Sequence, residues 1–152
     1  MKIILATDHA GFEMKEQVKA VLLARGFEIL DCGAETYHAS DDYPMYMHEA
    51  ARQLRMRVQD GDTASRSIVF GGSGTGEAIV MNRYHGVRTI VYNGQSIDIV
   101  ALGRQHNDAN CLAIGARFVN YEDTLEVIEI FLATDFEAGR HIARVQSIEK
   151  MS

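Results

Sequence analysis

Apolar runs and amphipathic segments alternate along the whole chain. Short apolar runs rich in β-branched residues predict buried strands, which we place at 2–7, 27–30, 67–70, 87–92 and 110–116. Apolar residues at helical spacing predict a first helix that contains Met14, Val18 and Leu22 and stops at Gly26. The same pattern predicts further helices at 41–58 (with Pro44 in the first turn), 77–84, 95–103, 121–133 and 138–149.

This alternation predicts an α/β fold. Strands that are apolar throughout are typical of a parallel sheet covered by helices on both faces. We find no interdomain linker or internal repeat and expect a single domain over 1–152. In such sheets ligands bind beyond the carboxyl ends of the strands, so the segments TDHAG, GGSGTGE, YNGQS and GAR are the places to look for a site.

The composition excludes several classes of protein. With 152 residues, 47% of them hydrophobic and 24% charged, the chain has the make-up of an ordinary globular domain. A net charge of −6 argues against non-specific nucleic-acid binding. Cys32 and Cys111 lack CxxC spacing and are expected to be buried thiols of a reducing compartment. The apolar run before Asp8 is too short for a signal peptide or membrane span, so we expect a cytoplasmic protein.

The segment 72–76 is a glycine-rich loop directly before a carboxylate, Glu77. It matches neither the GxGxxG dinucleotide pattern nor the GK[ST] phosphate loop, although nucleotide binding by another geometry stays open. Glycines let backbone N–H groups face a ligand, and a helix start favours negative charge, so the loop can hold an oxyanion. A base beside such a loop is suited to proton abstraction next to a carbonyl. The alternative is a tight turn followed by a solvated acid.

Histidines flank two of the predicted strands. Asp8 and His9 follow the first strand, while His106 and Asn107 stand just before the fifth. We expect both histidines on loops near the functional edge, although a lone histidine is more often structural or merely exposed. Spacings such as HExxH are absent, so we expect no dedicated metal site.

The last predicted helix carries paired arginines. Arg140 and Arg144 are four residues apart and share a helix face, away from the apolar side formed by Ile142, Val145 and Ile148. Two guanidinium groups on one face are suited to a phosphate dianion. A solvated cationic face is the alternative. Arg117, after the fifth strand, is a candidate third contact.

Taken in order, the segments DHAGF, DYP, GGSGTGE, RQHNDAN and GRH followed by RV resemble one family. The chain is similar over nearly its whole length to ribose-5-phosphate isomerase B, within the group that includes galactose-6-phosphate isomerase subunits. The resemblance implies a Rossmann-like three-layer α/β/α sandwich that needs no cofactor or metal. It also implies a homodimer or dimer of dimers with active sites at the interface, and the helix at 138–149 is expected to pack on the partner.

The resemblance implies interconversion of ribose 5-phosphate and ribulose 5-phosphate, in the pentose phosphate pathway, through an enediolate. Asp8, His9 and Asn107 would then contact substrate, and His106 would open the sugar ring. The loop would hold the enediolate through Gly72, Gly74 and Gly76, with Ser73 or Thr75 passing a proton between oxygens. Arg117, Arg140 and Arg144 match the family's arginine positions, which are mostly associated with phosphate.

The chain departs from many family members at one position. Those members have a catalytic cysteine directly after the third strand, where this chain has Gly71. In the other subgroup the glutamate of GGSGxGE is the base, and here that residue is Glu77. We therefore expect Glu77 to be the base and neither cysteine to be catalytic. Another phosphosugar (galactose 6-phosphate, allose 6-phosphate or a tetrose phosphate) and a non-catalytic nucleotide-binding module remain the alternatives.

Overall fold

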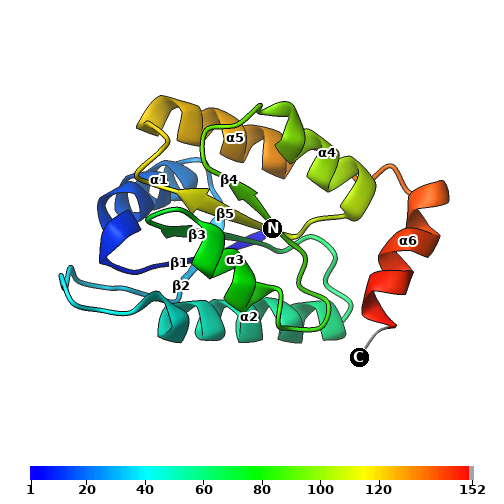
Figure 1. The fold of residues 1–152 in the computed structure, drawn as a ribbon, viewed down its shortest axis with the longest axis horizontal. Helices are drawn as coiled ribbons and strands as arrows, with labels where there is room; N and C mark the ends of the chain where they lie inside the picture. The colour runs from blue at the N-terminus through cyan, green and yellow to red at the C-terminus, as the bar shows by residue number, and fades with distance from the viewer. Residues whose placement is uncertain (151–152) are drawn as a thin grey trace.

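The computed structural model describes residues 1–150, which form a parallel sheet between two layers of helices (Figure 1). Within these residues the sheet has five strands in the order β2-β1-β3-β5-β4, and every neighbouring pair is parallel. The strands are β1 (Lys2–Thr7), β2 (Glu28–Asp31), β3 (Arg66–Gly71), β4 (Thr89–Tyr92) and β5 (Cys111–Gly115). The predicted fold class and sheet are thus confirmed.

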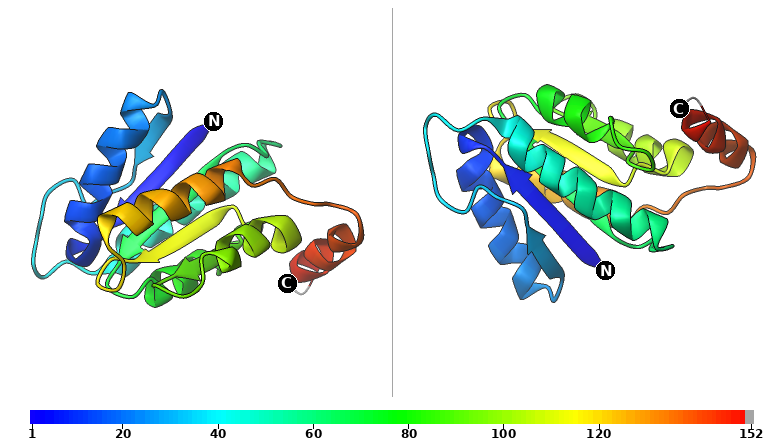
Figure 2. Two further views of the ribbon diagram at one scale, coloured as in Figure 1. Left: turned by 90° about the horizontal axis from the view of Figure 1, so that it is seen from above. Right: turned by 90° about the horizontal axis from the view of Figure 1, so that it is seen from below.

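Helices cover both faces of the sheet (Figures 1 and 2). One face is covered by α1 (Phe12–Ala24), α4 (Asp98–Asn107) and α5 (Tyr121–Ala133). The other is covered by α2 (Tyr43–Gln59) and α3 (Thr75–Met81). A short 3-10 turn, η1 (His9–Gly11), joins β1 to α1, and α6 (Arg140–Glu149) ends the described chain.

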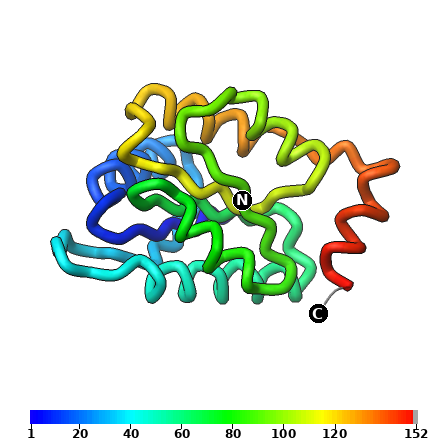
Figure 3. The backbone as a smooth tube through the Cα atoms, viewed as in Figure 1, coloured from blue at the N-terminus to red at the C-terminus, as the bar shows by residue number. Residues whose placement is uncertain are grey.

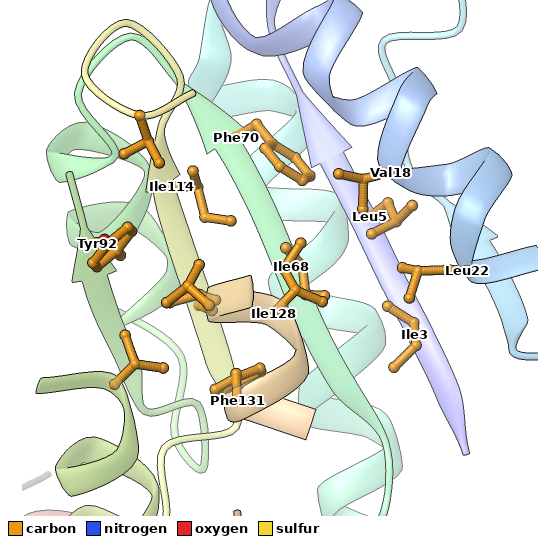
Figure 4. Packing of buried hydrophobic residues seen from close by; sticks show 14 of the residues in the cluster. Ile3, Leu5, Val18, Leu22, Ile68, Phe70, Tyr92, Ile114, Ile128 and Phe131 are labelled. Carbon is orange, nitrogen blue, oxygen red and sulfur yellow. The ribbon is translucent and has the colours of Figure 1, made fainter. Parts of the chain in front are cut away.

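The core explains why the strands are apolar throughout. Successive residues of β1, such as Ile3 and Ile4, face opposite helical layers, and both are fully buried. On one side, Ile68 and Ile114 of the central strands belong to one cluster with Ile128 and Phe131 of α5 (Figure 4). On the other, strand residues pack against α2 and α3, whose buried side chains include Met47, Leu54 and Met81.

Two predicted helices are shifted along the chain. The third helix begins at Thr75 instead of 77, because Gly74 takes a left-handed conformation (φ 76°) and serves as the N-cap. The fourth spans Asp98–Asn107 instead of 95–103, so His106 lies inside a helix rather than on a loop. The others lie close to their predicted bounds: α1 ends before Gly26 (φ 84°), and α2 has proline in its first turn.

Helix α6 stands at one end of the molecule, whereas the loop 32–42 projects at the opposite end (Figure 3). The apolar side predicted for this helix does not join the core of its own chain. Ile142 is 42% exposed and Ile148 56% exposed, while His141 is buried. Over residues 1–150, the structure contains no helix with both the length and the apolar character needed to cross a membrane.

Candidate active site

The carboxyl ends of three central strands meet at one edge of the sheet. Strand register places Thr7 beside Phe70 and Phe70 beside Ile114, so the segments that follow β1, β3 and β5 leave the sheet side by side. A cavity of about 380 Å³ opens there, within the usual range for small-molecule sites. It is lined by Asp8, His9, Ala10, Tyr43, Gly72, Ser73, Gly76, Glu77, Arg117 and Phe118.

Glu77 is the buried acid of this cavity. It is the third residue of α3, and only 3% of its surface is exposed. Its carboxylate accepts hydrogen bonds from its own N–H and from that of Gly74, the N-cap, as the glutamate of a capping box does. Desolvation by burial and the nearby charge of Asp8 raise the pKa of Glu77, and these two N–H groups only partly oppose the shift.

This environment suits a general base, because a carboxyl with a raised pKa accepts a proton more readily near neutral pH. The alternative of a solvated acid at position 77 is wrong, since the side chain is buried. A buried acid in a concave site with a shifted pKa is also a common sign of function.

The backbone of the glycine loop lines the cavity and packs closely against Tyr43, another residue of its wall. A β-carbon on Gly76 would lie 2.7 Å from Cζ of Tyr43, so only glycine lets the tyrosine ring pack there. Ser73 lines the cavity, and its Oγ accepts a hydrogen bond from the N–H of Thr75 at 3.3 Å. Thr75 itself is exposed and does not line the cavity, so the structure does not bring it to the site with Ser73.

Asp8 and His9 form the opposite wall. Asp8 Oδ1 accepts a hydrogen bond from the N–H of Ala10 at 2.9 Å and so caps η1. His9 Nδ1 lies 2.9 Å from Oδ1 of Asp41, which also accepts the His9 N–H at 2.8 Å. The hydrogen bond to Asp41 raises the pKa of His9, and the negative charge of Asp8 raises it further. Desolvation by burial lowers the pKa but does not cancel these two effects.

Sequence reasoning missed three residues at this edge. Tyr43 and Phe118 line the cavity, and Asp41 pairs with His9 across 32 positions of sequence. The DYP motif pointed to the neighbourhood of Tyr43, but no spacing rule connects Asp41 with His9.

The remaining candidate residues lie at the opposite end of the strands from Glu77. The expectation that His106 and Asn107 lie near the functional edge does not hold within one chain. They end α4, which runs antiparallel to the strands and delivers the chain to the start of β5 (Figures 1 and 3). The ring of His106 stacks on His141 of α6, with centroids 4.4 Å apart and planes 7° from parallel. Arg140 also belongs to α6 and places its Nε 3.4 Å from Nε2 of His141.

This second group is electropositive. Burial lowers the pKa of His141, as do the neighbouring charges of His106, Arg140 and Arg144, in that order, whereas Glu137 raises it. Arg144 follows Arg140 by one helical turn on α6, as the sequence predicts. The chain therefore carries a buried carboxylate beside a glycine loop at one end of the strands and a histidine–arginine group at the other.

Two groups of potential metal ligands occur in the described part of the chain: His106, Glu137 and His141, and Asp8, His9 and Asp41. In the first, the imidazole planes are parallel and stacked, so their in-plane lone pairs do not converge on one point. In the second, Nδ1 of His9 already hydrogen-bonds to Asp41. Hydrogen bonding and stacking account for both arrangements.

Neither cysteine lines the cavity. Cys111 is buried in β5 and Cys32 is partly buried after β2. Burial raises the pKa of each thiol to about 12, so the reactive thiolate is scarce at neutral pH.

A family model described as ribose/galactose isomerase matches residues 3–148. The chain belongs to the ribose/galactose isomerase family. Among its relatives, ribose-5-phosphate isomerase B of Mycolicibacterium paratuberculosis is 39% identical over 95% of this chain and 87% of the relative. The Escherichia coli protein of the same name is 36% identical over 97% of this chain and 93% of its own length.

Solved structures of this family share the fold over nearly the whole chain. Ribose-5-phosphate isomerase B from Mycoplasma genitalium, solved with bound ribulose-5-phosphate, superposes with a TM-score of 0.89 at 30% identity, covering 97% of this chain and 93% of that one. The enzyme from Anaplasma phagocytophilum gives 0.87 at 34% identity, covering 97% and 95%.

Proposed function

We propose that this family member interconverts ribose 5-phosphate and ribulose 5-phosphate through an enediolate. The observation that carries the proposal is the buried carboxylate of Glu77, with its raised pKa, beside a glycine loop in a cavity of sugar size. The family match and a relative that holds ribulose-5-phosphate support the substrate class. In cells this reaction would belong to pentose phosphate metabolism.

In the proposed reaction Glu77 removes the proton on carbon 2 of the open-chain aldose and returns it to carbon 1. The resulting enediolate is stabilised by N–H groups of the loop 72–76. Ser73, which lines the cavity, is placed to pass a proton between the two oxygens. Asp8 and His9 hold the substrate from the opposite wall, so the reacting carbon is fixed close to the base.

We further propose that the site is completed by a second copy of the chain. In one copy, His106, Asn107, Arg140 and Arg144 lie at the edge opposite Glu77. They adjoin the apolar side chains of α6, of which Ile142 and Ile148 are exposed. A homodimer that buries this face against the partner would bring the arginines to the substrate phosphate and His106 to the sugar ring oxygen, where it opens the ring.

The test is a panel of phosphosugars assayed with purified protein: ribose 5-phosphate, galactose 6-phosphate, allose 6-phosphate and erythrose 4-phosphate. We expect ribose 5-phosphate to give the highest kcat/KM. A higher value for another sugar would reassign the substrate within the same chemistry. Failure to isomerise any member of the panel would favour a non-catalytic binding module.

A further inference from the structure

A single carboxylate oxygen holds His9 at two points. Oδ1 of Asp41 lies 2.8 Å from the backbone nitrogen of His9 and 2.9 Å from its ring Nδ1. The side chain of Asp41 is 8% exposed and that of His9 is 27% exposed, so bulk water partly screens the pair. Because one bond fixes the backbone and the other fixes the ring, the histidine has little rotational freedom.

The loop that carries Asp41 is itself held against the end of β1. Thr7 donates its N–H to the carbonyl of Gly33 and accepts the N–H of Ala34, both at 2.8 Å. Lys15, which is fully buried, donates to the carbonyl of Ala34 at 2.8 Å and to both oxygens of Asp31 at 2.8 and 2.7 Å. These bonds fix the start of the 32–42 loop, and the Asp41–His9 contact closes its far end.

The pairing decides which nitrogen of His9 faces the ligand. An ionised carboxylate can only accept, so Nδ1 must carry a hydrogen and donate it to Asp41. Nε2 is then the ring nitrogen left for a ligand. His9 lines both the Glu77 cavity and an adjoining cavity of about 400 Å³, and these two cavities also share Arg117.

We propose that Asp41 is a positioning residue that fixes the ring of His9 so that Nε2 faces an anionic oxygen of the bound sugar phosphate. This rests on the proposed isomerase function for the identity of the ligand. Asp41 itself does not touch substrate; it acts through the ring that it holds. The proposal makes the affinity for phosphorylated sugar depend on Asp41, a loop residue that does not itself line either cavity.

The charges around the ring are consistent with this assignment. The acidic residues that line the two cavities with His9 are Asp8, Glu13 and Glu77. The permanently cationic side chain in their lining is Arg117. Desolvation raises the pKa of Asp41, but the hydrogen bonds from the N–H and ring of His9, together with the influence of nearby Tyr46, outweigh it and leave the pKa low. An ionised Asp41 and a charged His9 therefore favour each other near neutral pH.

The first experiment measures the pKa of His9 by NMR titration in the wild type, in Asp41→Asn and in Glu35→Gln. Asparagine keeps the size and one acceptor oxygen but removes the charge. Glu35 is an exposed acid of the same loop and is the matched control. We expect the His9 pKa to lie above 6.5 in the wild type and in the control, and to fall in Asp41→Asn. A wild-type value at or below 6.5, or no change in Asp41→Asn, would overturn the proposal.

The second experiment compares steady-state kinetics with ribose 5-phosphate from pH 6 to 9. For Asp41→Asn we expect KM to rise roughly tenfold at pH 7.5, the usual scale for losing a hydrogen bond to a charged group, with kcat within about twofold. Asp41→Glu should recover part of the loss. A fall in kcat with KM unchanged would count against a role in substrate binding. The NMR titration needs no turnover, so a failed isomerase assignment and a failed positioning role give different results.

Discussion

The carboxylate of Glu77 occupies the space in which a β-carbon on Gly71 would stand. Gly71 ends β3, and its neighbour in the sheet, Gly115, also lacks a side chain. This contact gives a physical reason for the subgroup difference that the sequence resemblance implies. A cysteine at position 71 and the glutamate at position 77 would compete for the same volume, so this chain has room for only one of the two side chains.

Gly71→Ala should therefore destabilise the protein and displace the base. Gly71 does not have a positive φ, so the backbone itself tolerates alanine. We expect a loss of about 1–3 kcal/mol in the free energy of unfolding, as is usual for overpacking. In a Glu77→Ala background the same change should cost much less, because the obstructing carboxylate is gone. Urea denaturation of the wild type, the two single variants and the double variant measures this coupling, and additive effects would show that the two positions do not share space.

Glu77→Gln should stabilise the protein at neutral pH. A carboxyl whose pKa is raised by folding favours the folded state while it is protonated, and that contribution is lost as pH rises through the folded pKa. At pH 7.5 the wild type keeps a buried charge that glutamine lacks, so the variant should unfold at higher denaturant concentration. At pH 4 the difference should shrink. The exposed first-turn acid Glu122 provides the control Glu122→Gln, for which no such pattern is expected.

Thiol reagents should leave the activity intact. With the pKa of Cys32 and Cys111 raised to about 12, only roughly one thiol in ten thousand is ionised at pH 8. Iodoacetamide treatment should therefore preserve turnover of ribose 5-phosphate, whereas the unfolded chain should gain two adducts by mass. Rapid inactivation that substrate prevents would contradict the assignment of Glu77 as base.

Mixed dimers test whether the site is shared between copies. Glu77→Gln and His106→Asn are each expected to be poorly active alone. After unfolding and refolding together, half of the dimers are mixed and each has one intact site, so about a quarter of wild-type activity should return. The mixture should stay inactive if both residues act within one chain.

Most of the fold follows from local patterns in the sequence. The central strands β1, β3 and β5 are apolar on both faces. This property alone predicts that they are buried and pair in parallel. Helix ends were harder to predict where a special backbone conformation decides them. The positive φ of Gly74 starts α3 two residues early, and the segment before β5 continues as helix to Asn107.

The site was predictable in part. Asp8, Ser73, Glu77 and Arg117 follow strands, and parallel pairing necessarily gathers such residues at one edge. The same rule places His106 at the opposite edge, since it precedes a strand. Asp41 escaped prediction because its contact with His9 depends on the path of an irregular loop, for which the sequence has no periodic signal.

The kinetics of Glu77→Gln with ribose 5-phosphate test the central claim most directly. Glutamine preserves the shape and an acceptor for the Gly74 N–H but cannot take a proton. We expect kcat to fall by at least about 100-fold, the lower scale of general-base catalysis, while Glu122→Gln turns over like the wild type. A folded Glu77→Gln protein that retained more than a tenth of wild-type kcat would show that another group removes the proton.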